Sequence, residues 1–225
     1  MLPAFCHPRA YEAFAAELAR LEQPGALFRA AVSLAMHELP QTDLAACEAA
    51  TGALAGTVRS RLRSESPSAR LAHLHDVLFD QQGFRGNVDD YYNPRNSYLP
   101  VVLETKRGIP ISLSLIYIEV ARRIGLRAEG INSPGHFLVR VDTESGAMLV
   151  DAFYEGRALS REEAMRRIGE ATGVPAESFS VTLEPASPRQ WLARMLNNLQ
   201  AIFAQRGQER ELAAMQELQA LLARE

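Results

Sequence analysis

Apolar residues recur at helical spacing from Tyr11 to about Gln81, and three polar interruptions divide this stretch into roughly four segments. The interruptions are QPG at 23–25, LPQTD at 39–43 and SESPS at 64–68. Glycine, proline and small polar residues of this kind end helices and begin new ones. The pattern therefore predicts a helical N-terminal layer over residues 1–82.

The pattern changes between Gly83 and Gly108, where glycine, asparagine, aspartate and proline become frequent. This composition predicts a long ordered loop that contains a short helix near Leu99 to Glu104. Loops of this length in a compact domain are often functional. Two interpretations remain open for its central polar residues: they line a groove beside the next helix, or they pack the loop itself. The residues concerned are Tyr91, Tyr92, Asn93 and Asn96.

The stretch after Gly108 is apolar over a wide helical surface. One face carries Leu113, Ile116, Tyr117, Val120 and Ile124, and Leu115 and Ile118 widen it. A helix that is hydrophobic on most of its surface is buried, and Gly125 is placed to end it. We therefore predict the core helix of the domain here.

Two strand patterns follow the core helix. HFLVRV and MLVDAFY alternate on either side of the turn DTESG, which predicts an antiparallel hairpin. His136 begins the first strand and Asp151 lies near the end of the second. Pairing of the strands would bring a nitrogen of His136 to within about 2.6 to 3.2 Å of an oxygen of Asp151.

The segment 188–225 contains two amphipathic stretches separated by Gly207, which predicts a helical hairpin. The chain as a whole is therefore expected to have an α+β fold. In this fold the helical layer precedes a core, residues 83–182, in which a buried helix packs on an antiparallel sheet. The hairpin follows the core, and we expect one compact unit.

Composition narrows the possible partners. The 225 residues carry a formal net charge of −3 and form no basic stripe, which argues against nucleic acid as a partner. The start of the sequence has no charged leader before a long apolar run, and nowhere do about 18 apolar residues follow one another. We expect a soluble, cytoplasmic protein that does not bind membranes.

Two cysteines, Cys6 and Cys47, are too few for a disulfide framework, which fits a reducing compartment. Cys47 is expected to be a small buried hydrophobe, and Cys6 to lie in a mobile terminus. In HLHD at 73–76 the two histidines, His73 and His75, would point to different faces of a helix. We therefore predict no metal site and no cofactor.

Nucleophilic hydrolysis needs a nucleophile, a histidine that takes its proton and a carboxylate that orients the histidine. A helix that begins near Ser112, then His136 and then Asp151 occur in that order. Here the chain resembles the transglutaminase-like superfamily, and within it the bacterial SirB-type branch. The motifs that carry the resemblance are GFRGN, YYNPRNSYL, RGIPISLSLIY, ARRIGL, PGHFLVR, DAFYEG and RMLNNL. The resemblance covers nearly the whole chain from about residue 25, and it implies a transglutaminase/papain-like core followed by a tetratricopeptide-like hairpin.

The sequence departs from that family where the nucleophile should be. Pro110 occupies the position that the resemblance gives to a nucleophilic cysteine, and Ser112 follows two residues later. A helix N-terminus lowers the pKa of a thiol, whereas a serine hydroxyl gains far less and depends on a well-aligned base. Ser112 is thus either a nucleophile or a residue that satisfies N–H groups in the first turn.

Two functions from different classes follow. In the first, the chain is a pseudoenzyme whose cleft binds a peptide or protein, with Tyr92, Asn93, Asn96 and Pro110 lining the cleft and the C-terminal hairpin as a docking surface. In the second, it is a serine-variant hydrolase or acyltransferase on peptide or amide bonds, with Ser112 as nucleophile, His136 as base and Asp151 orienting the base. The first accounts directly for the missing thiol, and we favour it because the resemblance implies a fold more securely than an activity. The sequence does not indicate an oligomeric state.

Overall fold

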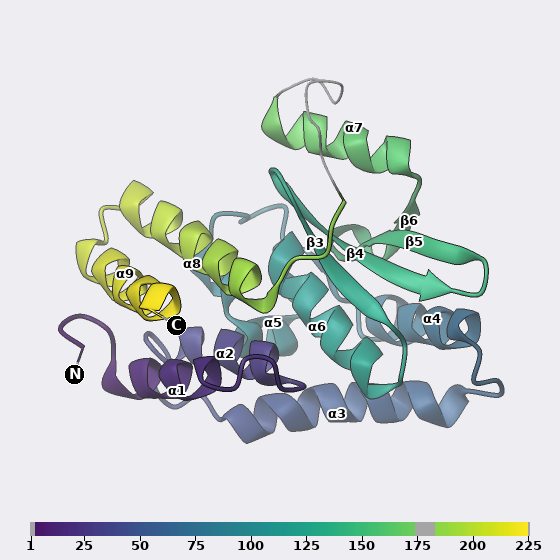
Figure 1. Ribbon diagram of the computed structural model, residues 1–225, viewed down its shortest axis with the longest axis horizontal. Helices are drawn as coiled ribbons and strands as arrows, with labels where there is room; N and C mark the ends of the chain where they lie inside the picture. The colour runs from purple at the N-terminus through teal and green to yellow at the C-terminus, as the bar shows by residue number, and fades with distance from the viewer. Residues whose placement is uncertain (1–2, 174–182, 225) are drawn as a thin grey trace.

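The computed structural model describes residues 3–173 and 183–224 (Figure 1). Its α-helices are α1 (Pro8–Leu18), α2 (Ala26–Ala35), α3 (Leu44–Arg61), α4 (Pro67–His75), α5 (Leu99–Thr105), α6 (Pro110–Arg123), α7 (Arg161–Thr172), α8 (Pro188–Gln205) and α9 (Glu209–Arg224). Three short helices of other types are η1 (Asp76–Gln81), η2 (Pro94–Ser97) and η3 (Ala152–Tyr154). The strands are β1 (Arg85–Gly86), β2 (Arg107–Gly108), β3 (Ala128–Ser133), β4 (His136–Thr143), β5 (Gly146–Asp151) and β6 (Arg157–Leu159). The predicted α+β class is confirmed.

The helices of the N-terminal layer start at the predicted interruptions. Asp43 and Ser66 cap α3 and α4, since their side-chain oxygens accept from the backbone N–H groups of Ala45 (2.9 Å) and Ala69 (3.2 Å). Such caps satisfy N–H groups that have no partner within the helix. Helix α4 continues into η1, so this layer ends at Gln81 as the periodicity predicts.

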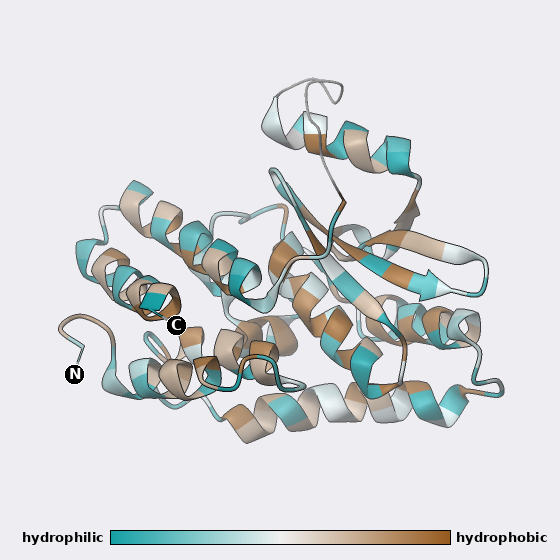
Figure 2. Cartoon of the chain, in the orientation of Figure 1, coloured by the Kyte–Doolittle hydropathy of each residue, from teal (hydrophilic) through white to brown (hydrophobic). Residues whose placement is uncertain are grey.

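Helix α6 is the central element, and it lies between the N-terminal helices and the sheet (Figure 1). Its residues are hydrophobic over most of its length (Figure 2), and all but three of those from Pro110 to Arg123 are buried. The sheet has the antiparallel order β3-β4-β5-β6. Side chains of alternating β4 residues, such as Phe137 and Val139, join the main core with α6, while Leu138 faces a smaller cluster under α7.

The C-terminal hairpin α8–α9 packs against α1 and α2, so one hydrophobic core includes residues from Cys6 to Leu222. Trp191 connects the hairpin to the sheet, because its ring lies 4.3 Å from the ring of Phe137. A Cβ atom at Gly130 of β3 would lie 2.0 Å from Trp191. Only glycine leaves room for this contact.

One expectation about the first residues is wrong. Cys6 is buried rather than mobile, with 4% of its surface exposed, and burial raises the pKa of its thiol to about 12. The carboxylate of Glu217 in α9 holds this segment, because it accepts backbone N–H groups of Ala4 (2.8 Å), Phe5 (3.1 Å) and Cys6 (2.8 Å). Cys47 is buried as predicted, and burial raises its pKa to about 11.

Several elements are not predicted by the patterns: α7, β3, β6 and the parallel pair β1–β2, which connects the two ends of the long loop. Residues 174–182, which close the predicted core segment, lie outside the described residues. Within residues 3–173 and 183–224, no helix combines the length and apolar character that crossing a membrane requires.

Candidate functional site

His136 and Asp151 form the pair that the sequence predicts. They lie at the start of β4 and the end of β5, which are antiparallel neighbours, and Nε2 of His136 is 2.9 Å from Oδ2 of Asp151. Each lies two positions along its strand from a leucine of the cluster under α7, His136 from Leu138 and Asp151 from Leu149, so both lie on the sheet face that α7 covers. A carboxylate only accepts hydrogen bonds. The shared proton therefore belongs to Nε2, and Nδ1 is the nitrogen left for another partner.

Asp151 is completely buried, and four donors satisfy its carboxylate. Besides His136, these are a guanidinium nitrogen of Arg167 at 2.8 Å and the backbone N–H groups of Phe153 (3.1 Å) and Tyr154 (3.3 Å). The guanidinium of Arg167 also lies 4.2 Å from the centre of the Tyr154 ring. Asp151 thus connects β5, η3 and α7 in addition to orienting the histidine.

Ser112 has its hydroxyl turned to the backbone. It is 0% exposed, and its Oγ lies 2.6 Å from the carbonyl oxygen of Asn96 and 3.0 Å from that of Ile109. The same oxygen accepts the N–H of Ile109 at 3.1 Å. A Cβ at Gly108 would lie 2.8 Å from this Oγ, which shows how closely the backbone surrounds it. The hydroxyl therefore acts as a cap at the start of α6.

Two adjoining hollows open beside the start of α6. The first, which we call the α8 groove, has a volume of about 150 Å³ and is lined by Tyr91, Tyr92, Ile109, Arg194, Asn198, Ala201, Ile202 and Gln205. The second, the His136 hollow, has a volume of about 20 Å³ and is lined by Tyr91, Ile109, Pro110, Ile111, Gly135, His136, Phe137, Arg194 and Asn198. Because four residues line both, the groove leads to the histidine. Pro110 and Ile111 face it there, not Ser112.

The predicted cleft residues divide into two pairs. Tyr92 lines the α8 groove and is 64% exposed, and Pro110 lines the His136 hollow. The side chains of Asn93 and Asn96 instead bond within the loop: Asn93 donates to a carboxylate oxygen of Asp90 at 2.7 Å, and Asn96 donates to the carbonyl oxygen of Asp90 at 2.7 Å.

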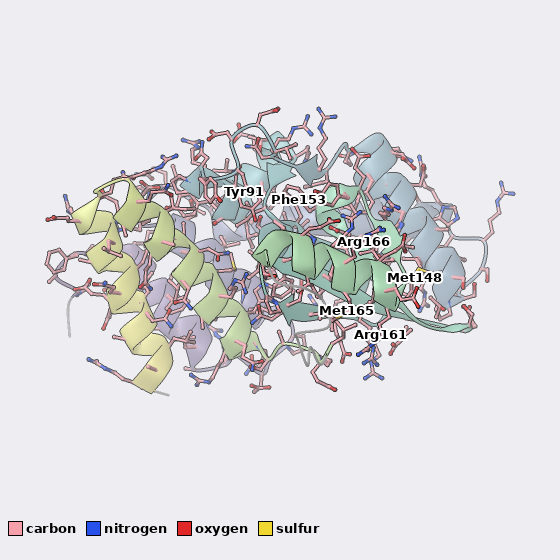
Figure 3. The ribbon with its side chains drawn as sticks, turned by 90° about the horizontal axis from the view of Figure 1, so that it is seen from above. Tyr91, Met148, Phe153, Arg161, Met165 and Arg166 are labelled. Atoms are coloured by element: carbon pink, nitrogen blue, oxygen red, sulfur yellow. The ribbon has the colours of Figure 1, made fainter. Side chains whose placement is uncertain are left out.

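Aromatic side chains surround the histidine. Tyr91 and Phe153, both labelled in Figure 3, come from the loop and from η3, and their ring centres are 5.8 Å apart. Burial raises the pKa of Tyr91, so its hydroxyl stays neutral. On the α7 side a third hollow of about 430 Å³ is lined by His136, Tyr154, Arg166, Arg167 and Glu170. The histidine therefore stands between two open regions.

Sequence reasoning missed the arginines of the site. Arg167 belongs to α7. The sequence does contain a signal for the start of this helix, the capping box of Ser160 and Glu163, in which each side chain accepts a hydrogen bond from the other residue's backbone N–H. Arg194 and Asn198 lie one turn apart on α8, on the polar edge of an amphipathic helix. That edge is visible in the sequence, but the groove that it borders is not.

The described residues hold no cluster of three or more histidine, cysteine, aspartate or glutamate side chains that could bind a metal ion. His75 bonds through Nε2 to the hydroxyl of Tyr117 at 2.9 Å. Burial lowers the pKa of His75 to about 4. This histidine is therefore a neutral residue at the edge of the core.

Comparison with known proteins identifies relatives. Residues 45–197 match the transglutaminase-like superfamily. A UPF0162 protein from Xylella fastidiosa strain 9a5c is 38% identical over 182 residues, which are 79% of this chain and 65% of the relative. A UPF0162 protein from Pseudomonas aeruginosa is 30% identical over 201 residues, which are 89% of this chain and 73% of the relative.

A further relative is F-box only protein 21 from Mus musculus, which is 37% identical over 161 residues, 68% of this chain but only 25% of the mouse protein. The chain thus spans 65% of the Xylella relative and a quarter of the mouse one. No solved structure matches the chain. The family match covers more than half of the sequence and includes α6, His136 and Asp151, and the chain therefore belongs to the transglutaminase-like superfamily.

Proposed function

We propose that this chain is a non-catalytic module that binds a peptide or protein segment in the α8 groove. The observation that carries the proposal is the environment of Ser112, whose hydroxyl is fully buried and bonded to the backbone at Asn96 and Ile109. A serine nucleophile must deliver its hydroxyl proton to a base within hydrogen-bond reach. Here the proton belongs to a helix cap, and the residues that face His136 are Pro110 and Ile111.

The groove itself supports the binding role. It is concave, and it combines aromatic and aliphatic walls with a few polar groups, as ligand sites commonly do. The stretch shared with F-box only protein 21 makes up a quarter of that protein, which fits a module that functions as part of larger chains. We also assign the chain to the SirB-type branch and α8–α9 to the tetratricopeptide-like class, on the motifs quoted above.

One observation favours a second candidate, a serine-variant hydrolase or acyltransferase. The His136–Asp151 pair has the 2.9 Å separation that an acid–base pair needs. For this reaction Ser112 would have to leave its cap and turn toward Nδ1 of His136, and the N–H of Ile109 and the carbonyl oxygen of Asn96 would lose this partner. Loss of a buried hydrogen bond of this kind costs about 1 to 3 kcal/mol.

The two candidates are separated by labelling the native protein with a fluorophosphonate probe and mapping the modified residue by mass spectrometry. If the chain is a binding module, the probe should leave Ser112 unmodified. The immobilised chain should also retain peptides from a pool of fluorescein-labelled hexapeptides. Modification of Ser112 in the wild type that disappears in His136→Ala would establish the hydrolase instead.

A further inference from the structure

Arg194 is the charged residue of the α8 groove, and it lies where the groove meets the His136 hollow, since it lines both. Its guanidinium has neutral partners: Asn132 Oδ1 at 3.1 Å, Asn198 Oδ1 at 3.3 Å and the carbonyl oxygen of Ser133 at 3.5 Å. Among the described residues no carboxylate lies within ion-pair distance of it. Neutral partners from that part of the chain hold the half-buried cation in place, and no carboxylate there pairs with it.

The contrast with Arg167, on the other side of the histidine, supports this point. Arg167 forms an ion pair, in which a guanidinium nitrogen lies 2.8 Å from Oδ2 of Asp151. Among the residues that the structure describes, no aspartate or glutamate lines either the α8 groove or the His136 hollow. A ligand that reaches the inner end of the groove therefore meets a cation without a competing acid, and a carboxylate complements it.

The shape of the groove indicates an extended chain. Its α8 wall runs from Arg194 to Gln205, and at about 1.5 Å of rise per residue this stretch is about 16 Å long. An extended peptide advances about 3.3 Å per residue, so roughly five residues fit along it. The α8 groove as a whole has a volume of about 150 Å³. It therefore takes up one apolar side chain of that peptide, while the peptide backbone lies along its open side.

The inner end of the groove indicates where such a chain stops. Beyond Arg194 the His136 hollow has a volume of only about 20 Å³, which is enough for one water molecule but not for another residue. A peptide that enters from the Gln205 end and reaches Arg194 therefore ends there. The group that an ending chain presents is its α-carboxylate.

From these four features we propose that the α8 groove binds the free carboxyl terminus of a partner polypeptide. The partner's last residues lie extended along α8, its α-carboxylate binds Arg194, and one apolar side chain fills the groove beside Tyr91 and Tyr92. The proposal rests on the binding function proposed above, and it goes further by naming the part of the partner that is recognised.

The experiment uses two pools of fluorescein-labelled hexapeptides of the same composition, one with free carboxyl termini and one with amidated termini. Each pool is passed over the immobilised full chain, and the retained peptides are sequenced by mass spectrometry and their affinities measured by fluorescence anisotropy. Arg194→Gln removes the cation but keeps the length of the side chain. Arg224→Gln is the matched control, because it removes an exposed arginine that does not line the groove. Ala201→Trp fills the groove from an exposed position of α8.

We expect free-carboxyl peptides to bind the wild type at least about tenfold more tightly than their amidated forms, because a charge-assisted hydrogen bond is lost on amidation. Arg194→Gln should remove this preference, and Arg194→Lys, which keeps the charge, should retain part of it. Arg224→Gln should leave it unchanged, and Ala201→Trp should abolish binding of both pools. Thermal melts of every variant establish that the fold is intact.

Two other outcomes would overturn the inference, and they differ in what they imply. If the amidated pool binds as well as the free pool and Ala201→Trp still blocks both, the groove binds peptides but does not recognise carboxyl termini. If neither pool is retained by the wild type above the level of Ala201→Trp, the peptide-binding function fails as well.

Discussion

The two ends of the site, the start of α6 and the His136–Asp151 pair, differ in how their polar groups are used. At the start of α6 the hydroxyl of Ser112 bonds the backbone of its own loop. At the other end the imidazole keeps its carboxylate at 2.9 Å, with Nδ1 free for another partner. Asp151 also binds Arg167 and two backbone N–H groups. The aspartate of the pair therefore has structural connections of its own, besides its bond to the histidine.

The largest effect is expected from removing that aspartate. Asp151→Ala leaves the guanidinium of Arg167, which is 15% exposed, and the ring of His136 without their common partner. Breaking a buried ion pair by removing one member costs about 3 to 5 kcal/mol. We expect the free energy of unfolding in urea to fall by about 3 kcal/mol or more. Asp142→Ala, which breaks partly exposed ion pairs with Arg127 and Arg140, should cost under about 1 kcal/mol. Equal losses would show that Asp151 has no special structural role.

The next effect is expected at His75, a half-buried histidine at the edge of the core. Burial holds the pKa of His75 at about 4, while Asp80 acts weakly in the opposite direction. The unfolded chain therefore binds more protons than the folded one between pH 6.5 and 4, and stability falls as the pH decreases through that window. The stabilisation is fully present above about pH 6.5, and its loss reaches up to about 3 kcal/mol near pH 4.

Urea unfolding at a series of pH values measures this dependence. In His75→Gln the slope assigned to His75 should disappear while the slopes of other groups remain. An unchanged pH profile in that variant would mean that His75 does not titrate as its burial requires.

A smaller effect is expected at the start of α6, where two serines provide a matched pair. Ser112→Ala removes a cap whose loss leaves the N–H of Ile109 unbonded, and we expect a cost of about 1 to 2 kcal/mol. Ser114 is equally buried, but its hydroxyl has no hydrogen-bond partner among the described residues. Ser114→Ala should therefore change the unfolding free energy by less than about 0.5 kcal/mol. A costless Ser112→Ala would contradict the capping role.

The smallest signal comes from a thiol placed in the cap. Ser112→Cys puts a sulfur where no surface is exposed, so iodoacetamide should label the native variant only slowly at neutral pH, although a thiol in a helix's first turn has a lowered pKa when it is accessible. The rate is followed by intact-mass spectrometry, with the variant unfolded in urea as reference. Fast labelling that depends on His136 would mean that the histidine reaches the side chain at position 112. That result would favour the serine-variant hydrolase or acyltransferase.

The elements that local patterns describe were predictable. Helix α6 and strands β4 and β5 follow from apolar periodicities, and these place His136 beside Asp151. Strand β3 was missed because AEGINS has no alternating pattern. Gly130 interrupts the pattern because a larger residue would overlap Trp191, which lies far along the chain. Arg167 and Arg194 were missed for a similar reason. Each lies on a polar helix edge like many others, and only the packing of α7 and α8 brings these two to the histidine.

The clasp between Glu217 and the backbone of Ala4, Phe5 and Cys6 has a consequence for the time course of folding. It joins groups separated by up to 213 positions, and closing so long a loop is entropically costly until the chain between them has already folded. We therefore expect the clasp to form after the rate-limiting barrier. Glu217→Gln should leave the refolding rate unchanged and accelerate unfolding, so this short segment contributes to how long the native state persists rather than to how fast it is reached.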